Sequence, residues 1–441
     1  MRSIFYVLFF CIYIFFMQNI SPLGVDWLDW HYQRLINVVQ FLKINGYFTH
    51  YGFSIWSMVE NCASDQQCWK NHIYLSHLFF SKIFYLFIIE FFNENSFQFY
   101  GQIIDKLFIF FTAILISEIL IDCFKKNCSK IQVFIISAMC FIFFIVNPWT
   151  YKMMIASWDY IFFLPFFLLG IFLIYKNKKK IGLTIIFFAG FFEYQLAAGV
   201  AVYYLLLHLL YITTKGNLFK NLLPFHFKKN NLFLSYNSLI VIILLLPVIF
   251  HFLLQFYFLK NISYIEPSGT SLLTRMGISG EDIHNGGILG ALQFLAGNRI
   301  TICFENDIQN LINIMQKDNS STLPIYIYNC LLSHTGIFLV SIISILFLLN
   351  EFRKTSFLKS IISPFIFLIL CNSFILQQSS SVHLMGYSYL FSIVFSLGLS
   401  ILFFNIWKKF RSNLTIVFLT PVLIGIILLC IRVSMLTGNY G

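Results

Sequence analysis

Eleven runs of apolar residues, each long enough to cross a lipid bilayer, constrain this chain more than any other feature. The chain has 441 residues, 59% of them hydrophobic, and phenylalanine alone occurs 56 times. A soluble domain has too little interior for so many apolar side chains, so we predict an all-α polytopic membrane protein with eleven transmembrane helices. The predicted spans are residues 4–20, 103–122, 131–147, 158–175, 181–195, 197–213, 235–257, 331–349, 357–376, 385–404 and 413–433.

Three segments leave alternatives open. Residues 181–213 form two spans if "FFEYQLA" is a tight turn, or one long helix if it is not. Residues 73–93 are apolar enough to cross but contain His77 and Lys82, and we expect this segment to lie flat on the outer membrane surface. The N-terminal run could also be a signal peptide. Because no small-x-small cleavage site follows it, we interpret residues 4–20 as a retained first span.

The distribution of charge favours one orientation. With the N-terminus in the cytoplasm, 18 of the 29 Lys and Arg residues lie inside, whereas 15 of the 18 acids lie outside. This follows the positive-inside rule, so the net charge of +11 requires no nucleic-acid partner. We expect the functional site on the acidic outer face.

This topology divides the chain into five predicted parts. They are the first transmembrane helix (1–20), a first periplasmic loop with juxtamembrane helices (21–102), helices two to seven (103–257), a second large periplasmic loop (258–330), and the last four helices with a short periplasmic C-terminus (331–441).

The segment after the first span has helical periodicity from Asp26 to Asn45, and Gly46 is a natural C-terminal cap. Asp26 and Asp29 stand in its first turns, where the helix dipole favours acids. From the residues alone, the preferred interpretation is that both aspartates only stabilise the N-terminal end of the helix. Aromatic residues such as Trp30 then belong to an interfacial belt. The alternative is a general base beside aromatic rings that could hold a sugar.

Four cysteines fall into two pairs within the predicted outer loops. An oxidising periplasm would allow Cys62 to bond to Cys68 and Cys303 to bond to Cys330. The alternative is that these spacings are accidental. We find no His, Cys and Asp spacing typical of a metal site, and the sequence requires no cofactor, although it leaves the use of a divalent cation open.

The outer segment has a distinctive order: an acid after the first span, then "YQRLINVVQFLKINGYF", an aromatic "YGFSIW" and a flat apolar segment. This order resembles the first periplasmic loop of the GT-C superfamily, the lipid-phosphosugar-dependent glycosyltransferases. The resemblance implies a GT-C-like fold with Asp29 as the catalytic carboxylate and Asp26 as the reserve. It also implies a second acid just before the fourth span, where Asp159 fits.

A narrower likeness follows further along the chain. The segments "WDYIFFLPFFLLGIFLIYKNKKK" and "FFAGFFEYQLAAGVAVYYLLL" look like the phage-type serotype-converting O-antigen glucosyltransferases of enteric bacteria. The likeness covers roughly residues 1–215 and implies that Tyr194 and Gln195, in a short outer turn, bind substrate. It also implies a bacterial inner-membrane protein with a periplasmic active site. The second large loop and the last four spans match no pattern that we can name.

The resemblance implies an inverting-type transfer of a glucosyl or related hexosyl group from an undecaprenyl-phosphate donor to an O-antigen sugar. We expect Asp29 to take the proton of the acceptor hydroxyl. Phosphate is a good leaving group, so no general acid is required, unlike in two-carboxylate glycosidases. Cations would stabilise the leaving phosphate, and the candidates are Arg34, Lys152, Arg275 and Arg299. Membrane proteins that make and flip the donor are implied partners.

Two other functions stay open. An O-antigen polymerase works on the same face, and the spacing of Arg275 and Gly286 resembles an outer-loop element of such enzymes. The early outer loop with its acid favours the transferase. A polysaccharide flippase or other transporter ranks third, because most predicted spans contain few ionisable groups.

Overall fold

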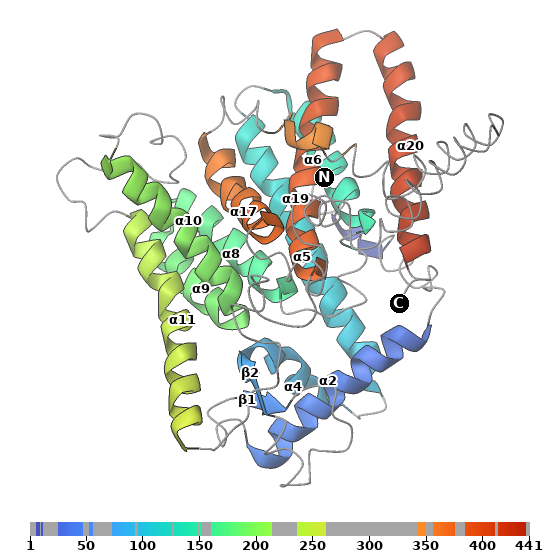
Figure 1. Ribbon diagram of the computed structural model, residues 1–441. Coiled ribbons are helices and arrows are strands. Elements are labelled where there is room, and N and C mark those ends of the chain that lie inside the picture. Colours follow the sequence, from blue (N-terminus) through green and yellow to red (C-terminus); the bar gives the residue numbers. More distant parts are fainter. Residues whose placement is uncertain are drawn as a thin grey trace, which may run out of the picture.

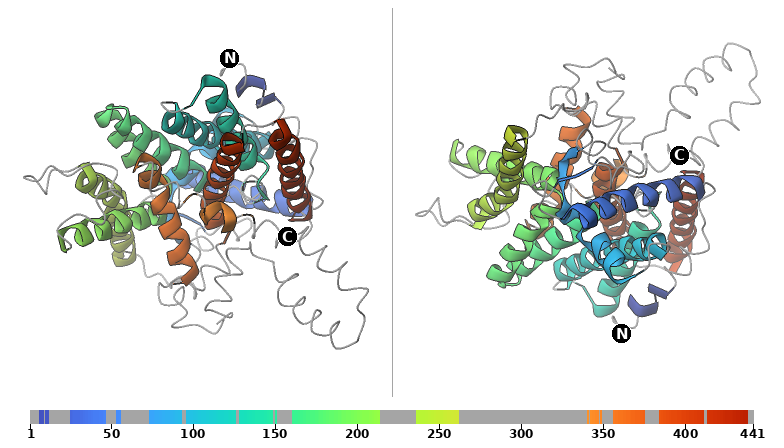
Figure 2. Two further views of the ribbon diagram at one scale, coloured as in Figure 1. Left: turned by 90° about the horizontal axis from the view of Figure 1, so that it is seen from above. Right: turned by 90° about the horizontal axis from the view of Figure 1, so that it is seen from below.

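The computed structural model shows a bundle of long helices with a small layer of first-loop elements across one end (Figure 1). Seen from below in Figure 2, this layer crosses the end of the bundle. The structure describes residues 6–8, 10–11, 25–46, 53–55, 73–92, 96–125, 128–148, 150, 160–213, 236–261, 340, 342–346, 348, 356–374, 384–410 and 413–437.

Apart from one two-stranded sheet, the described residues are almost entirely helical, which confirms the predicted helical class. Three helical segments are long and apolar enough to cross a bilayer, namely Phe97–Phe124, Ser238–Tyr257 and Tyr389–Lys409. They mark a transmembrane protein, while the number of eleven spans stays a prediction. The bundle helices are α5 (Phe97–Phe124), α6 (Lys130–Ile145), α8 (Tyr160–Tyr175), α9 (Lys179–Phe192), α10 (Tyr194–Thr213), α11 (Tyr236–Asn261), α17 (Ser356–Phe374), α19 (Leu384–Phe410) and α20 (Asn413–Thr437).

The uncertain region 181–213 contains two helices. Helix α9 ends at Phe192 and α10 begins at Tyr194, with Glu193 between them in an extended conformation (φ −148°, ψ 92°). One continuous helix is therefore excluded. Because α9 has 14 residues and each residue adds about 1.5 Å, it is only about 21 Å long.

The first loop is only partly helical. Strand β2 (Ile73–Leu78) pairs antiparallel with β1 (Phe53–Ile55), and the chain continues through the 3-10 helix η1 (Phe79–Lys82) into α4 (Ile83–Phe91). Juxtamembrane helices were predicted in this loop, and 73–93 was expected to lie flat. The structure has the helix α4 in the second half of this segment and the strand β2 in the first half, where aromatic and β-branched residues suit a paired strand. Helix α4 has nine residues, about 14 Å, which is too short to cross a bilayer.

The predicted helix at residues 26–45 is confirmed as α2 (Val25–Asn45). Gly46 ends it with a φ of 86°, a left-handed conformation that favours glycine. Helix α2 packs against α4 and α5, and Lys43 at its end forms an ion pair with Glu90 of α4 at 3.9 Å. Its buried apolar face consists of Leu35, Val38, Val39, Phe41 and Leu42.

Glycines let neighbouring bundle helices approach closely. A Cβ atom on Gly182 of α9 would lie 2.6 Å from the carbonyl oxygen of Gly170 in α8, so no side chain fits there. Gly398 of α19 makes a similarly close approach to the backbone at Ser344. Such contacts between small residues are typical of membrane helix packing.

Positive side chains collect at the end of the bundle opposite the first-loop layer. Lys125, at the end of α5, donates a 2.8 Å hydrogen bond to Asp122, and Lys176, at the end of α8, forms an ion pair with the same carboxylate. The hydrogen bond to Asp122, helped by the charge attraction, holds the pKa of Lys125 above its ordinary value. We call this end the basic end.

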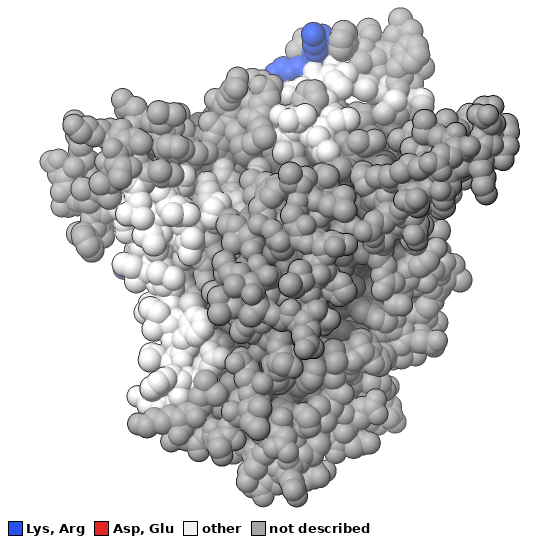
Figure 3. Space-filling view, in the orientation of Figure 1, with Lys and Arg blue, Asp and Glu red and all other residues white. Residues whose placement is uncertain are grey.

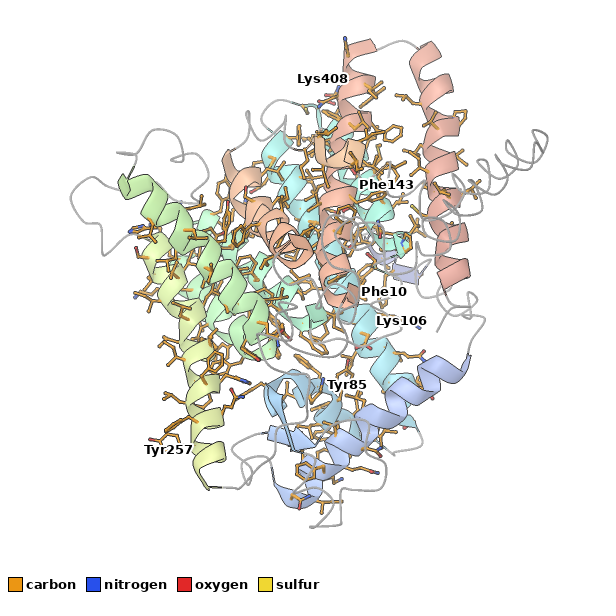
Figure 4. The ribbon with its side chains drawn as sticks, viewed as in Figure 1. Phe10, Tyr85, Lys106, Phe143, Tyr257 and Lys408 are labelled. Atoms are coloured by element: carbon orange, nitrogen blue, oxygen red, sulfur yellow. The ribbon has the colours of Figure 1, made fainter. Side chains whose placement is uncertain are left out.

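Helix α19 adds its own lysines to the basic end. The ring of Phe404 lies 5.5 Å from that of Phe124 at the end of α5, so the two helices finish side by side. Lys408 lies at the top of the molecule in Figure 4, and the most prominent group of basic side chains visible in Figure 3 is at the same place. In the part of the chain that the structure describes, lysines are thus concentrated at this end of the bundle, as the positive-inside rule describes for one side of a membrane protein.

Candidate functional site

The first-loop layer is attached to the bundle by a buried tyrosine–aspartate pair. The hydroxyl of Tyr85 in α4 donates a hydrogen bond to the carboxylate of Asp105 in α5, and both residues are 0% exposed. The rings of Phe97 and Phe162 lie 6.2 and 5.6 Å from the Tyr85 ring. Burying a carboxylate without hydrogen bonds is costly, so this donor both stabilises Asp105 and fixes α4 on α5.

A lysine follows this aspartate directly. Lys106 is half-buried, and successive residues of a helix point to different faces, so its side chain leaves α5 away from that of Asp105. Within the described part of the chain, Lys106 forms no ion pair, unlike Lys43 with Glu90. In Figure 4, Lys106 lies on the side of the bundle where α2 begins, away from α9, α10 and α11.

Aromatic rings join the first-loop layer to the end of α9. The ring of Phe84 in α4 stacks on Phe192 at 5.6 Å and contacts Phe162 of α8 at 5.0 Å. The ring of Phe80 in η1 lies 5.0 Å from that of Phe191. The first loop therefore covers the place where α9 ends and α10 begins.

A second polar cluster lies at this junction. Glu193 is 1% exposed, and its Oε1 atom accepts a 3.1 Å hydrogen bond from the backbone N–H of Gln195, as an N-cap residue does. The Gln195 side chain donates a 3.3 Å hydrogen bond to the Tyr194 hydroxyl. The Tyr194 ring stacks on His251 of α11, with centroids 3.8 Å apart and planes at 14°. Four polar side chains from two segments of the chain thus meet among apolar helices.

The start of α2 and this junction lie on different sides of the bundle. Helix α2 begins on the side of α20, whereas α9, α10 and α11 stand on the other side (Figures 1 and 2). The structure therefore does not bring the predicted pair Tyr194 and Gln195 to the start of α2. For the predicted site residues in α2, the structure describes the backbone but not the side chains. These residues are Asp26, Asp29, Trp30 and Arg34.

The remaining predicted site residues lie outside the described part of the chain. Asp159 immediately precedes α8, whose Phe162 contacts Tyr85 and Phe84. Among the described residues, no three His, Cys, Asp or Glu side chains form a group that could hold a metal ion. The predicted residues outside the description are Asp159, Arg275, Arg299, Cys62, Cys68, Cys303 and Cys330.

Sequence reasoning passed over four ionisable residues that the structure places at helix contacts: Asp105, Lys106, Glu193 and His251. The available signal was their position inside or beside apolar runs, where ionisable groups are rare and mark functional sites. The resemblance to GT-C enzymes instead predicted site residues in the outer loops. Periodicity alone does not reveal that α4 covers Asp105, because the Tyr85 contact joins separate segments of the chain.

We expect that replacing Tyr85 with phenylalanine will lower the stability of the protein. The change removes a hydroxyl donor from the buried carboxylate of Asp105, which should cost about 1–3 kcal/mol. Thermal unfolding of the detergent-solubilised protein measures the effect. Tyr100→Phe is the matched control, because that ring is only half-buried and stacks on Phe92 at 4.0 Å. Equal melting temperatures for the two variants would contradict the expected result.

The site at the first-loop layer combines a buried acid, a half-buried cation and the start of α2 with its two further acids. In general, carboxylates can accept hydroxyl hydrogen bonds and a cation can hold a phosphate. Comparison with known protein families, curated proteins and solved structures finds no match for this chain.

Proposed function

We propose that the protein is a GT-C-type glycosyltransferase that moves a glucosyl or related hexosyl group from undecaprenyl phosphate to an O-antigen sugar, with inversion. The observation that carries this proposal is the layer formed by α2, the sheet and α4 across the end of the bundle away from the basic end. Such a layer can enclose a sugar phosphate at the membrane surface while its lipid chain stays among the helices. The resemblance of the first loop supports the same activity.

In this proposal Asp29 takes the proton from the attacking hydroxyl, with Asp26 in reserve, and Asp159 binds sugar hydroxyls or acts as the second carboxylate. Phosphate leaves without a general acid, so binding of the departing charge matters more than its protonation. Because Tyr194 and Gln195 lie away from the start of α2, in this proposal they contact a part of the substrate distant from the reacting hydroxyl. Further candidate contacts are Trp30 to the sugar and Arg34, Arg275 and Arg299 to the phosphate.

The proposed topology has eleven spans, with the basic end in the cytoplasm and the first-loop layer in the periplasm of a bacterial inner membrane. The lysines around Asp122 and at the end of α19 support it, because short cytoplasmic loops carry an excess of Lys and Arg. The substrate would be a lipid-linked donor delivered by proteins that make and flip it.

This orientation predicts opposite labelling of two exposed positions. In a background without other exposed cysteines, Ile44→Cys should react with a membrane-impermeant maleimide in spheroplasts, because Ile44 lies in the first-loop layer and is 62% exposed. Lys178→Cys, beside the basic end, should react only after permeabilisation. The reverse pattern would invert the topology, and labelling of both positions in intact spheroplasts would contradict a membrane between them.

The proposed activity is tested by mass spectrometry of purified O-antigen, with the polysaccharide gel ladder beside it, from cells with and without the gene. One added hexose per repeat at unchanged ladder length is the expected result. A changed ladder without added mass would instead point to an O-antigen polymerase. An O-antigen unchanged in both mass and ladder would overturn both assignments.

A second candidate function is the movement of a lipid-linked saccharide across the membrane. It is favoured by the buried Glu193 and His251, because transporters carry ionisable groups near broken or interrupted helices at membrane depth. The two functions differ in product: a flippase relocates its substrate without adding mass to a repeat. The hexose measurement therefore separates them.

A further inference from the structure

Lys106 is a positively charged side chain that is partly removed from water. It is half-buried in α5, one of the helices apolar enough to span a bilayer, and removing a charged group from water is costly unless an anion compensates it. Asp105 attracts it, but that carboxylate is fully buried and already accepts a hydrogen bond from Tyr85. The two side chains also leave the helix about 100° apart.

Three described lysines form ion pairs with acids. Lys125 and Lys176 share Asp122, and Lys43 pairs with Glu90. In the described part of the chain, Lys106 has no such pair. Its ammonium is therefore available to an anion supplied by a ligand, and no neighbouring carboxylate has to be displaced first.

The depth of Lys106 identifies which anion can reach it. Lys125 marks the basic end of α5 and lies 19 residues after Lys106, which corresponds to about 29 Å along the helix. This length is close to the hydrocarbon thickness of a bilayer, about 30 Å. With Lys125 at one membrane boundary, this length places Lys106 near the other, where lipid phosphate groups lie. Its neighbour in the sequence, Asp105, holds α4 of the first-loop layer through Tyr85.

We propose that Lys106 binds the phosphate of the lipid-linked donor, and that the Tyr85–Asp105 pair positions α4 beside it. This inference rests on the proposed function and adds a phosphate-binding residue to it. The ammonium is a point charge that can hold a phosphate oxygen, with the polyprenyl chain among the helices and the hexose in the first-loop layer. That layer also contains the start of α2, toward which Lys106 lies in Figure 4.

The direct test is lipid binding by the purified full-length protein, using undecaprenyl phosphate, undecaprenol and phosphatidylglycerol as probes. The wild type should bind undecaprenyl phosphate more tightly than undecaprenol. Lys106→Gln should weaken binding of undecaprenyl phosphate by about ten- to a hundredfold, because a hydrogen bond to a charged group is lost. It should leave undecaprenol binding unchanged.

Two further variants separate a phosphate contact from a loss of structure. Lys106→Arg keeps the positive charge and should retain most of the binding. Lys43→Gln removes a lysine of the first-loop layer that is already paired with Glu90, and it should bind like the wild type. If Lys106→Gln does not fold, Lys106→Met, which suits an apolar helix, replaces it in the same comparison.

The outcomes also separate this inference from the proposed function. Equal affinity of Lys106→Gln and wild type for undecaprenyl phosphate overturns the inference, as does a wild type that does not distinguish the phosphate from the alcohol. Equally tight binding of phosphatidylglycerol through Lys106 would assign the cation to membrane lipid and overturn the donor assignment. If binding depends on Lys106 but cells show no added hexose, the phosphate site stands and the transferase proposal fails.

Discussion

Replacing Asp29 with asparagine is expected to lower hexose transfer by about 10²–10⁴-fold while the amount of folded protein stays normal. In the proposed mechanism this carboxylate takes the proton from the acceptor hydroxyl, and an amide of the same size cannot. Asp29 lies in the second turn of α2, and the described buried residues of this helix, Leu35 to Leu42, come later in it. The measurement is hexose per O-antigen repeat in cells, followed by initial rates with undecaprenyl-phosphate glucose.

Two other carboxylates provide matched controls for Asp29. Asp26→Asn changes an acid one turn earlier in α2 and should reduce transfer much less if Asp26 is only the reserve. Glu90→Gln removes an exposed carboxylate of α4 that pairs with Lys43, and it should leave transfer unchanged. Near-normal transfer by Asp29→Asn would remove this residue from the base role. A loss in Asp26→Asn alone would move the role to Asp26.

Sequence periodicity predicted the elements whose apolar faces are continuous. Helix α2 and its glycine cap follow the expected bounds, because Leu35, Val39 and Leu42 recur at helical spacing and all three are buried. The long apolar helices of the bundle were predictable for the same reason. The break between α9 and α10 was predictable only as one of two alternatives, since both sides of Glu193 are apolar.

Features that depend on contacts between distant segments were not predictable. Strand β2 exists because Ile55 and Ile73 are paired across the sheet, and the apolar run from residue 73 onward gave no sign of that partner. The position of Asp105 inside an apolar run marked it as unusual, but its contact with Tyr85 of the first loop was not predictable. Charge counting predicted that the lysines of the basic end lie on one side of the membrane, but it could not show which lysines pair with acids, as Lys125 and Lys176 do with Asp122.

Replacing Gly182 with leucine is expected to prevent the protein from accumulating in a folded form. Even the Cβ atom would lie 2.6 Å from the carbonyl oxygen of Gly170 and 2.6 Å from a side-chain carbon of Ile174, so α8 and α9 would have to separate. Gly182→Ala should already lower stability by about 1–3 kcal/mol, as overpacking does. Fluorescence-detected size-exclusion chromatography after a heating series measures both variants.

Gly425 supplies the matched control, because it is also a helical glycine but a Cβ atom there meets nothing within 4 Å. Gly425→Ala should be neutral or stabilising by up to about 1 kcal/mol, since alanine favours helix more than glycine. Equal melting of the two alanine variants would contradict the close crossing of α8 and α9.

The crossing of α8 and α9 also affects the candidate site. Phe192 at the end of α9 stacks on Phe84 of the first-loop layer, so separating the two helices should weaken the attachment of that layer as well.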